Sequence, residues 1–275
     1  MRLIPDHLSP SYHQLMVLAP SCIRVPSVFR NVTVDLRRHA SIMADLQSMR
    51  GTIYLRDGAL QPWELTRDGR HYQAADNDSW HLLTLDQAGR VSASVRYHEH
   101  ENSVPFQNLG LRHSALAQST EWGPRLRAAI EAEMTSARVQ GFAYVEVGGW
   151  AVADERRCTT EALRTALATY GLAQLLGGCL GVTTATVRNR SSSILRRIGG
   201  RPLEAGGSEI PRYYDARYGC EMEILRFASY SMNPRYQGWI DQIRNSLLTV
   251  PVLCQAGEGT DSGFFDNLEH SEVLA

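Results

Sequence analysis

The sequence of 275 residues contains no lysine, so all 28 of its basic residues are arginine. Pyridoxal phosphate enzymes, Schiff-base aldolases and P-loop ATPases each need a lysine amine at the reacting centre or on the phosphates. The absence of lysine excludes these three classes. The formal net charge of -1 provides no overall attraction to nucleic acid, although clustered arginines could still bind anions locally. We therefore expect no nucleic-acid partner.

Cysteines are few and long apolar runs are absent. The five cysteines are widely spaced and form no C-x-x-C pair: Cys22, Cys158, Cys179, Cys220 and Cys254. This pattern argues against a disulfide framework and against a zinc site, and it predicts a reducing cytoplasm as the location. The apolar run at residues 15–19 is too short for a signal peptide. The sequence has no run of ~20 apolar residues, so we expect no transmembrane helix.

The chain divides into three parts by composition. Residues 1–31 carry four prolines without a clear period, which predicts an irregular N-terminal arm. Residues 32–250 contain the periodic segments and are expected to form one domain. Residues 251–275 contain five acidic and no basic residues, and we expect them to form a flexible tail.

Periodicity predicts the elements of this domain. A short strand is expected at 32–39, a helix at 40–60, a loop at 61–80 and a hairpin at 81–100 whose alternation suggests one buried and one open face. A helix follows at 122–141, closed by Gly141. Strands at 142–154 and 179–187 then alternate with helices at 159–178 and 190–200, which predicts two parallel neighbouring strands joined by a crossover. A last strand at 220–227 and a last helix at 234–248 complete the pattern.

Three segments resemble one known family. EVGGWAV at 146–152 is similar to the strand pattern E-x-S/T-R-F-x-V, VSASVRY at 91–97 to a strand ending in a functional arginine, and residues 187–199 to a fourth-helix segment. In their order and spacing, over about residues 32–228, they resemble the GNAT acyltransferases, most closely the branch of acyl-homoserine lactone synthases and N-acyl amino acid synthases. The resemblance implies an α/β (α+β) fold, with a mixed central sheet, an N-terminal hairpin and a βαβα core that binds the acyl thioester.

The resemblance also implies functional residues. Glu146 takes the position of the family's catalytic glutamate, and Arg96, with Asp76 and Asp78, would bind an amino-acid-like acceptor. The donor would lie against the end of the strand and the following helix N-terminus, at Val152, Arg156, Arg157, Cys158, Thr159 and Thr160. Three positions depart from the family pattern: Gly149 replaces an arginine, Thr160 a glycine and Leu195 a tyrosine. The last departure implies that no tyrosine acts there as general acid.

The residues themselves leave alternatives open. Glu146 lies in an otherwise apolar strand, where burial would raise its pKa and suit it as a base, or it could be a structural carboxylate paired with an arginine. The helix N-terminus at 156–160 could stabilise an anion, or a threonine could simply cap it. Cys158 beside two arginines could act as a nucleophile.

Each of two further clusters allows two interpretations. Four arginines, Arg188, Arg190, Arg196 and Arg197, could join Arg156 and Arg157 on one face that binds coenzyme A phosphates or an acidic carrier protein, or they could form a solvated helix face. His98-Glu99-His100 suggests a metal site, but it lacks a third ligand nearby in sequence, so we expect no metal.

The resulting hypothesis is a cytoplasmic N-acyltransferase without a permanently bound cofactor. It would move an acyl group from acyl carrier protein or acyl-CoA to the amine of an amino acid or similar small molecule. The alternatives are an acetyl-CoA-dependent N-acetyltransferase and a non-catalytic GNAT-fold module that binds a ligand. Acyl length, acceptor, carrier and oligomeric state stay open.

Overall fold

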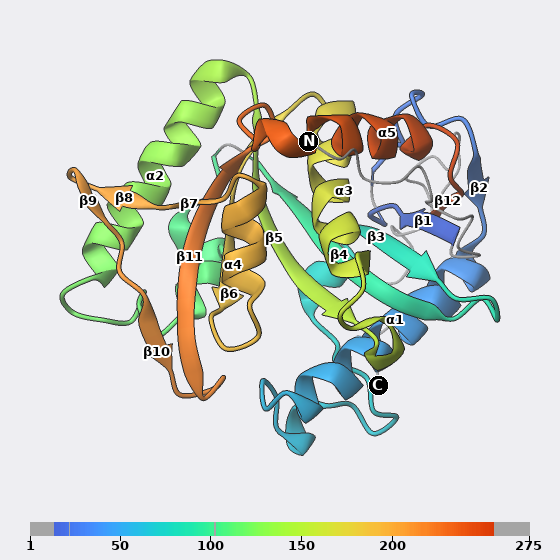
Figure 1. Ribbon diagram of the computed structural model, residues 1–275, viewed down its shortest axis with the longest axis horizontal. Coiled ribbons are helices and arrows are strands. Elements are labelled where there is room, and N and C mark those ends of the chain that lie inside the picture. Colours follow the sequence, from blue (N-terminus) through green and yellow to red (C-terminus); the bar gives the residue numbers. More distant parts are fainter. Residues whose placement is uncertain (1–13, 22, 102, 256–275) are drawn as a thin grey trace, which may run out of the picture.

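The computed structural model describes residues 14–21, 23–101 and 103–255, and these form a mixed sheet covered by helices on both faces (Figure 1). The strand order is β10-β11-β6-β5-β4-β3-β1-β12-β2, and the short strand β7 pairs with β11 outside this path. The predicted class, an α/β fold with a mixed central sheet, is therefore confirmed.

The strands of this sheet include long central ones and short peripheral ones. In chain order they are β1 Gln14–Leu18, β2 Val32–Val34, β3 Trp80–Leu85, β4 Val91–His100, β5 Ala143–Val152, β6 Cys179–Thr186, β7 Arg201–Pro202, β10 Tyr213–Asp215, β11 Cys220–Ala228 and β12 Val252–Cys254. A separate two-stranded sheet consists of β8 Glu204–Ala205 and β9 Ser208–Glu209.

Five helices of the described chain are divided between the two faces of the sheet. Helices α1 Leu36–Arg56 and α2 Gly123–Gln140 pack on one face, and α3 Glu161–Leu175, α4 Ser191–Ile198 and α5 Gln237–Leu247 pack on the other. The predicted C-terminal stop of α2 is confirmed, because Gly141 has a φ of 71° that glycine adopts without steric cost. The two helical layers leave β3 and β4 at the centre of the molecule.

The β3–β4 hairpin is present as expected, but its expected open face is not. All six residues of β3 are buried, because α1 covers one face of the hairpin and α3 covers the other. The alternating residues of this hairpin therefore point into two different buried environments, one against α3 and one against α1. Apolar residues such as Val95 and Tyr97 face α3, whereas Ser94 and Arg96 face the α1 side.

Two strands lie where the sequence analysis expected an irregular arm and a flexible tail. Residues 14–18 form β1, which is antiparallel to β3 and parallel to β12. For these residues, and for Val252–Cys254, the expectation of irregular chain is wrong, because both segments complete the sheet and are buried there. The rest of the expected tail, 256–275, and residues 1–13 of the arm lie outside the described residues.

Strands β5 and β6 are parallel, as the βαβ pattern predicts, but they pair over only part of their length. Ala143 to Val147 pairs with Cys179 to Thr183, although β5 continues to Val152 and β6 to Thr186. Beyond this paired region β5 runs away from β11 and its neighbours (Figure 1). The backbone of β5 past Val147 therefore has one edge that β6 does not occupy.

Gly181 allows β6 to pack closely against its neighbours near the point where β5 and β6 begin to diverge. A Cβ atom at this position would lie 2.5 Å from Cζ of Phe227 and 2.8 Å from the carbonyl oxygen of Val145. Because the second contact is to backbone, we expect Gly181→Ala to lower the free energy of unfolding by about 1–3 kcal/mol, measured by urea denaturation. Gly238→Ala, which meets no atom within 4 Å, is the matched control and is expected to cause no loss; equal losses would contradict the packing argument.

Candidate functional site

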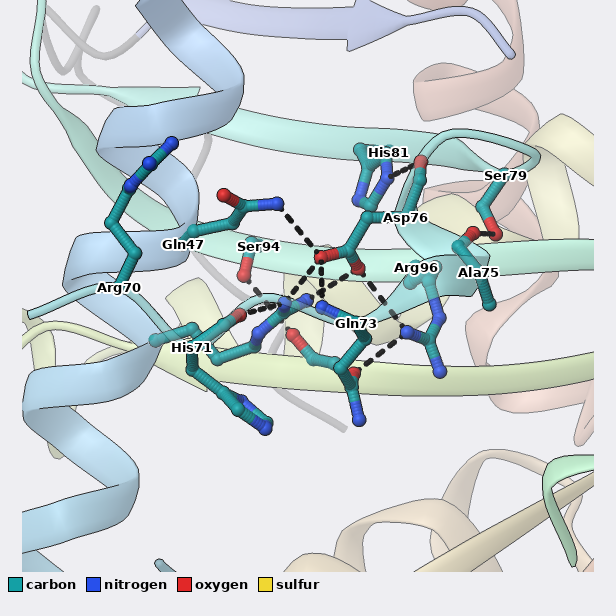
Figure 2. Close-up of polar contacts among 12 residues, drawn as sticks. Gln47, Arg70, His71, Gln73, Ala75, Asp76, Ser79, His81, Ser94 and Arg96 are labelled. Carbon is teal, nitrogen blue, oxygen red and sulfur yellow. Dashed lines mark hydrogen bonds and ion pairs between the residues drawn. The ribbon is translucent and has the colours of Figure 1, made fainter. Parts of the chain in front are cut away.

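A fully buried ion pair organises the α1 side of β4. Both Nη atoms of Arg50 in α1 donate to the carboxylate of Asp76, at 2.9 and 2.6 Å, and both side chains are 0% exposed. Asp76 also accepts from Gln47 at 3.1 Å and from the backbone N–H of Gln73 at 3.2 Å (Figure 2). Burial alone raises the pKa of Asp76, but the bonds and charge of Arg50 outweigh it and hold this pKa well below its usual range.

Arg96 is the point at which this buried cluster meets the surface. Its Nη1 donates to Gln73 at 2.7 Å and to Asp76 at 3.2 Å (Figure 2), and its side chain is 16% exposed. Its buried Nε has no hydrogen-bond partner among the described residues. Two guanidinium groups thus share one carboxylate, so the cluster can accept a further anionic group at Arg96.

Asp76 and Asp78, which the sequence analysis grouped together, have different positions. Both carboxylate oxygens of Asp76 already accept hydrogen bonds from protein groups. Asp76 can therefore orient Arg96, but it has no free oxygen for the substrate that accepts the acyl group. Asp78 is exposed, and the contact given for it is through its carbonyl oxygen, 3.2 Å from Nδ1 of His98. The structure therefore brings Arg96 and Asp76 together and leaves the carboxylate of Asp78 apart from them.

Glu146 in β5 lies on the same face of the sheet, further along from Arg96. Its Oε2 accepts from Nε2 of His100 at 2.9 Å and from the N–H of Gly110 at 2.8 Å, while Oε1 accepts from the N–H of Leu111 at 2.8 Å. Burial raises the pKa of Glu146, but these three bonds outweigh burial and leave the pKa below its ordinary value. The expected raised pKa is therefore wrong, and so is the alternative of an arginine partner. Glu146 is a carboxylate oriented by histidine and backbone.

The strand between Glu146 and Val152 contains a bulge at two glycines. Register shifts between Ser94 and Arg96 in the β4–β5 pairing, and Gly149 has a φ of 60°. A Cβ atom on Gly149 would lie 3.2 Å from Cβ of Arg96 and 3.3 Å from Nη1 of Arg50. This explains the departure from the family pattern at Gly149: side chains from β4 and α1 fill the space where its own side chain would begin.

The N-terminus of α3 is the expected donor site. Val152 ends β5, and Thr160 is the first residue flanking the helix. The N-cap residue Thr160 makes no side-chain cap bond, but Oγ1 of Thr159 accepts from the N–H of Glu161 at 3.1 Å, so a threonine satisfies one N–H at this end. Cys158 is exposed and has a φ of 62°. Capping leaves other N–H groups of the first turn pointing along the helix axis, where an anion is stabilised.

The arginines expected on one face divide into separate pairs. Arg157 lies 2.5 Å from the carboxylate of Asp57, at the end of α1, and Arg188 donates to the carbonyl oxygen of the same residue at 2.6 Å. Arg196 instead pairs with the buried Glu223. Arg157 and Arg188 thus converge on one partner, whereas Arg196 binds a different one, so the structure does not bring the whole set together.

Mostly apolar side chains, with two threonines and Arg226, line a small cavity where β5 and β6 diverge, on the α3 side of the sheet. The cavity has a volume of about 20 Å³, and its walls include Val147, Thr183, Leu195 and Phe227. Leu195 occupies the position where the family has a tyrosine, and here it contributes only an apolar wall. The unpaired edge of β5 therefore has this cavity on one face of the sheet and the polar cluster of Arg50, Asp76 and Arg96 on the other.

His81 provides a pH-dependent test of the polar cluster. Its Nε2 lies 2.8 Å from the carbonyl oxygen of Asp76, and burial, assisted by Arg96 and Arg50, lowers its pKa to about 4. The unfolded chain then binds more protons below about pH 6.5, so the free energy of unfolding should fall as pH decreases from about 6.5 to 4, by up to about 1.4 kcal/mol per pH unit.

His81→Gln keeps a side-chain N–H but takes up no proton. We expect it to reduce this slope by the share of one proton in urea denaturation series between pH 7 and pH 5, while His71 and His98, whose pKa values burial also lowers to about 4, keep their own shares. Stability curves that stay parallel for the wild type and His81→Gln would contradict the assigned neutral state of His81.

Neither a family model nor a curated protein matches the sequence. Solved structures do match. BjaI, a CoA-dependent acyl-homoserine lactone synthase solved with MTA, superposes with a TM-score of 0.53 and 13% identity, covering 90% of this chain and 96% of BjaI. The BjaI structure with SAM and isopentyl-CoA gives the same values. TofI, in a ternary complex with an inhibitor and MTA, gives a TM-score of 0.48 and 16% identity over 86% of this chain and 96% of TofI.

The match to BjaI extends over nearly the whole of both chains. At 13% identity it shows that the fold is shared. The resemblance to the acyl-homoserine lactone synthase branch, inferred from three segments of sequence, is therefore confirmed as a resemblance of fold. No helix among the described residues is long and apolar enough to span a membrane.

Several residues of the site carry no sequence signal of their own. Arg50 lies in the middle of α1 and Gln73 in a polar loop, where neither stands out among many similar residues. His100 was noted only as part of a possible metal motif. Within the described residues, no three His, Cys, Asp or Glu side chains gather as a metal site, and His100 binds Glu146 instead.

Proposed function

We propose that this protein is an N-acyltransferase, which moves an acyl group from acyl-CoA or acyl carrier protein to the amine of an amino acid or similar small molecule. The observation that carries the proposal is the divergence of β5 from β6 beyond Val147. This divergence lies beside Arg96 and Glu146 on one face and leads to the N-terminus of α3. A donor and an acceptor can approach each other there from opposite faces of the sheet.

The donor is proposed to use the free edge of β5. The amide groups of a pantetheine arm can pair with strand residues 148–152 as an added strand would. Its phosphates would then lie at the N-terminus of α3, where backbone N–H groups and the helix dipole favour anions. Val152, Cys158, Thr159 and Thr160 line this end, with Arg156 and Arg157 adding positive charge. The BjaI structure with SAM and isopentyl-CoA supports a comparable pairing of substrates on the same fold.

The acceptor is proposed to lie against Arg96. The guanidinium of Arg96 has N–H groups beyond those used by Gln73 and Asp76, and a carboxylate is their natural partner. The hydrogen bond to Asp76 fixes the orientation of Arg96. An acyl thioester donor and cysteines that are free throughout the described residues both fit a reducing cytoplasm.

The chemistry needs no permanent cofactor. The amine nitrogen bonds to the thioester carbon, its surplus proton passes to a base, and the C–S bond of the tetrahedral adduct then breaks. The thiolate leaves and takes up a proton, so the products are an amide and a free thiol. Backbone N–H groups along the free edge of β5 can stabilise the oxyanion.

An acetyl-CoA-dependent reaction is the second candidate. The cavity of about 20 Å³ beside Val147 and Phe227 has room for about one water-sized group, which favours a short acyl chain unless the walls move. Comparing acetyl-CoA with octanoyl-CoA as donors separates the two candidates.

The test is to incubate the purified protein with octanoyl-CoA or acetyl-CoA, the twenty amino acids and SAM. Thiol release and N-acylated products are followed by thiol titration and mass spectrometry. An amide product that appears together with free thiol is expected. Thioester binding without turnover on any amine would reject the proposal in favour of a binding module.

A further inference from the structure

Two histidines of β4 lie on the face of Arg96 and Glu146: His100, which orients Glu146, and His98, which has no role in the site described so far. His98 and His100 share the face of Arg96, because side chains two residues apart point the same way. Their rings meet edge to face, with centroids 4.4 Å apart. His98 pairs in register with Glu146, and His100 binds the carboxylate of Glu146.

The hydrogen bonds of His98 define which of its nitrogens can accept a proton. Nδ1 lies 3.2 Å from the carbonyl oxygen of Asp78 and 2.9 Å from Oγ of Ser79, whose own proton goes to the carbonyl oxygen of Ala75. A carbonyl oxygen can only accept, so Nδ1 carries the proton and Nε2 has a free lone pair. Nε2 has no hydrogen-bond partner among the described residues and is not one of the fully buried nitrogens.

Glu146 is poorly placed to take a proton from a substrate. Its two oxygens already accept three N–H groups, and these bonds favour its charged form. Its best-directed lone pairs are therefore occupied by protein donors. The proton of the acceptor amine needs another base on this face of the sheet.

We propose that Nε2 of His98 accepts the proton from the acceptor amine, and that the negative charge of Glu146, which His100 holds in place, supports the imidazolium that forms. The inference rests on the proposed N-acyltransferase function. It gives Glu146 the part of a charged support, in place of the base that the sequence suggests.

Position along the strand selects His98 over His100. Arg96 pairs with Gly148 at the bulge, where β5 has already parted from β6. At about 3.4 Å per residue, His98 lies about 7 Å from Arg96 along β4 and His100 about 14 Å. His98 is therefore the nearer of the two to an amine that meets a thioester at the free edge of β5.

The charges around His98 fit a cycle of protonation and release. Burial, together with the neighbouring His100 and Arg96, lowers the pKa of His98 to about 4, so the ring is neutral and ready to accept at neutral pH. When the amine attacks, its surplus proton goes to Nε2, the C–S bond breaks, and the thiolate takes that proton from the imidazolium or from water.

The test compares two replacements of His98 in the full chain, with octanoyl-CoA and the acceptor found for the wild type. His98→Asn keeps an N–H near the position of Nδ1, and so the bond to Asp78, but it has no base. His98→Ala removes both. We expect each to lower kcat by about 10²–10⁴-fold with little change in thioester affinity, and imidazole to restore activity to His98→Ala. His39→Gln on α1 is the control for replacing a buried histidine; in the wild type the ring of His39 binds the carbonyl oxygen of Ala19, which follows β1.

The outcomes separate this inference from the function on which it rests. A wild type that acylates its amine while His98→Asn keeps full kcat would overturn the inference alone. Loss of kcat in His100→Gln, which keeps the bond to Glu146, with full activity in His98→Asn would transfer the base to His100 and also overturn it. A wild type without any transfer would overturn the proposed function, and the inference with it.

Discussion

Replacing Asp76 with alanine is expected to lower the free energy of unfolding by about 3–5 kcal/mol, because it leaves a buried guanidinium without its counter-charge. Arg50 and Asp76 are both 0% exposed, and Arg96 and Gln47 lose the same acceptor. The measurement is urea denaturation followed by circular dichroism at pH 7. Asp78→Ala, two residues further along and exposed, should change stability by no more than about 0.5 kcal/mol.

The pH dependence of the Asp76 contribution has a definite sign. Its pKa in the folded protein lies below the ordinary value of about 3.9 for the unfolded chain. The contribution is therefore complete above about pH 5 and is lost only as pH falls below the unfolded value. Asp76→Ala should thus be destabilised equally at pH 6 and pH 8. A loss smaller than 1 kcal/mol would mean that Arg50 finds water or another partner, and that the buried pair contributes little.

The long central elements could be predicted because their signals are local. The β3–β4 hairpin has a turn at Asp86–Gly89 between two apolar runs, and α2 has an apolar period closed by Gly141. Each pattern lies within about twenty residues of sequence. Such segments specify their own structure before any distant part of the chain is considered.

Strands β1 and β12, next to the edge strand β2, could not be predicted in the same way. β1 has five residues and β12 has three, and each is stabilised by pairing with the other across more than 230 positions of sequence: Val17 with Val252, and Leu18 with Leu253. A three-residue segment beside a proline has no period of its own. Its strand conformation comes from the partner, which sequence patterns do not reveal.

The candidate site was found in part for a related reason. Glu146 and Arg96 could be located because each belongs to a strand motif, but their partners come from segments without a motif. Arg50 comes from the middle of a helix, and Gly110 and Leu111 provide only backbone N–H groups. The pKa of Glu146 depends on those partners, which is why burial alone gave the wrong direction.

Glu146→Gln is expected to lower kcat by about 10²-fold, the low end of the effect of disabling a general base, because it weakens the support of the proposed base His98. The amide offers one acceptor oxygen where the two carboxylate oxygens serve three N–H donors, so either Leu111 loses its acceptor or His100 and Gly110 lose theirs. The negative charge that supports the proposed imidazolium is also lost. The measurement is kcat from thiol release with octanoyl-CoA, beside thioester affinity from calorimetry.

The pH profile of the wild type gives the second half of this test. Because the pKa of Glu146 lies below its ordinary value, its carboxylate stays charged throughout the range from pH 5 to pH 9, and kcat should show no titration by this group there. Glu121→Gln, at an exposed position before α2, is the control and should keep wild-type kcat. If Glu146→Gln keeps full kcat and thioester affinity, the carboxylate only holds the loop at Gly110 and Leu111, and acyl transfer proceeds without it.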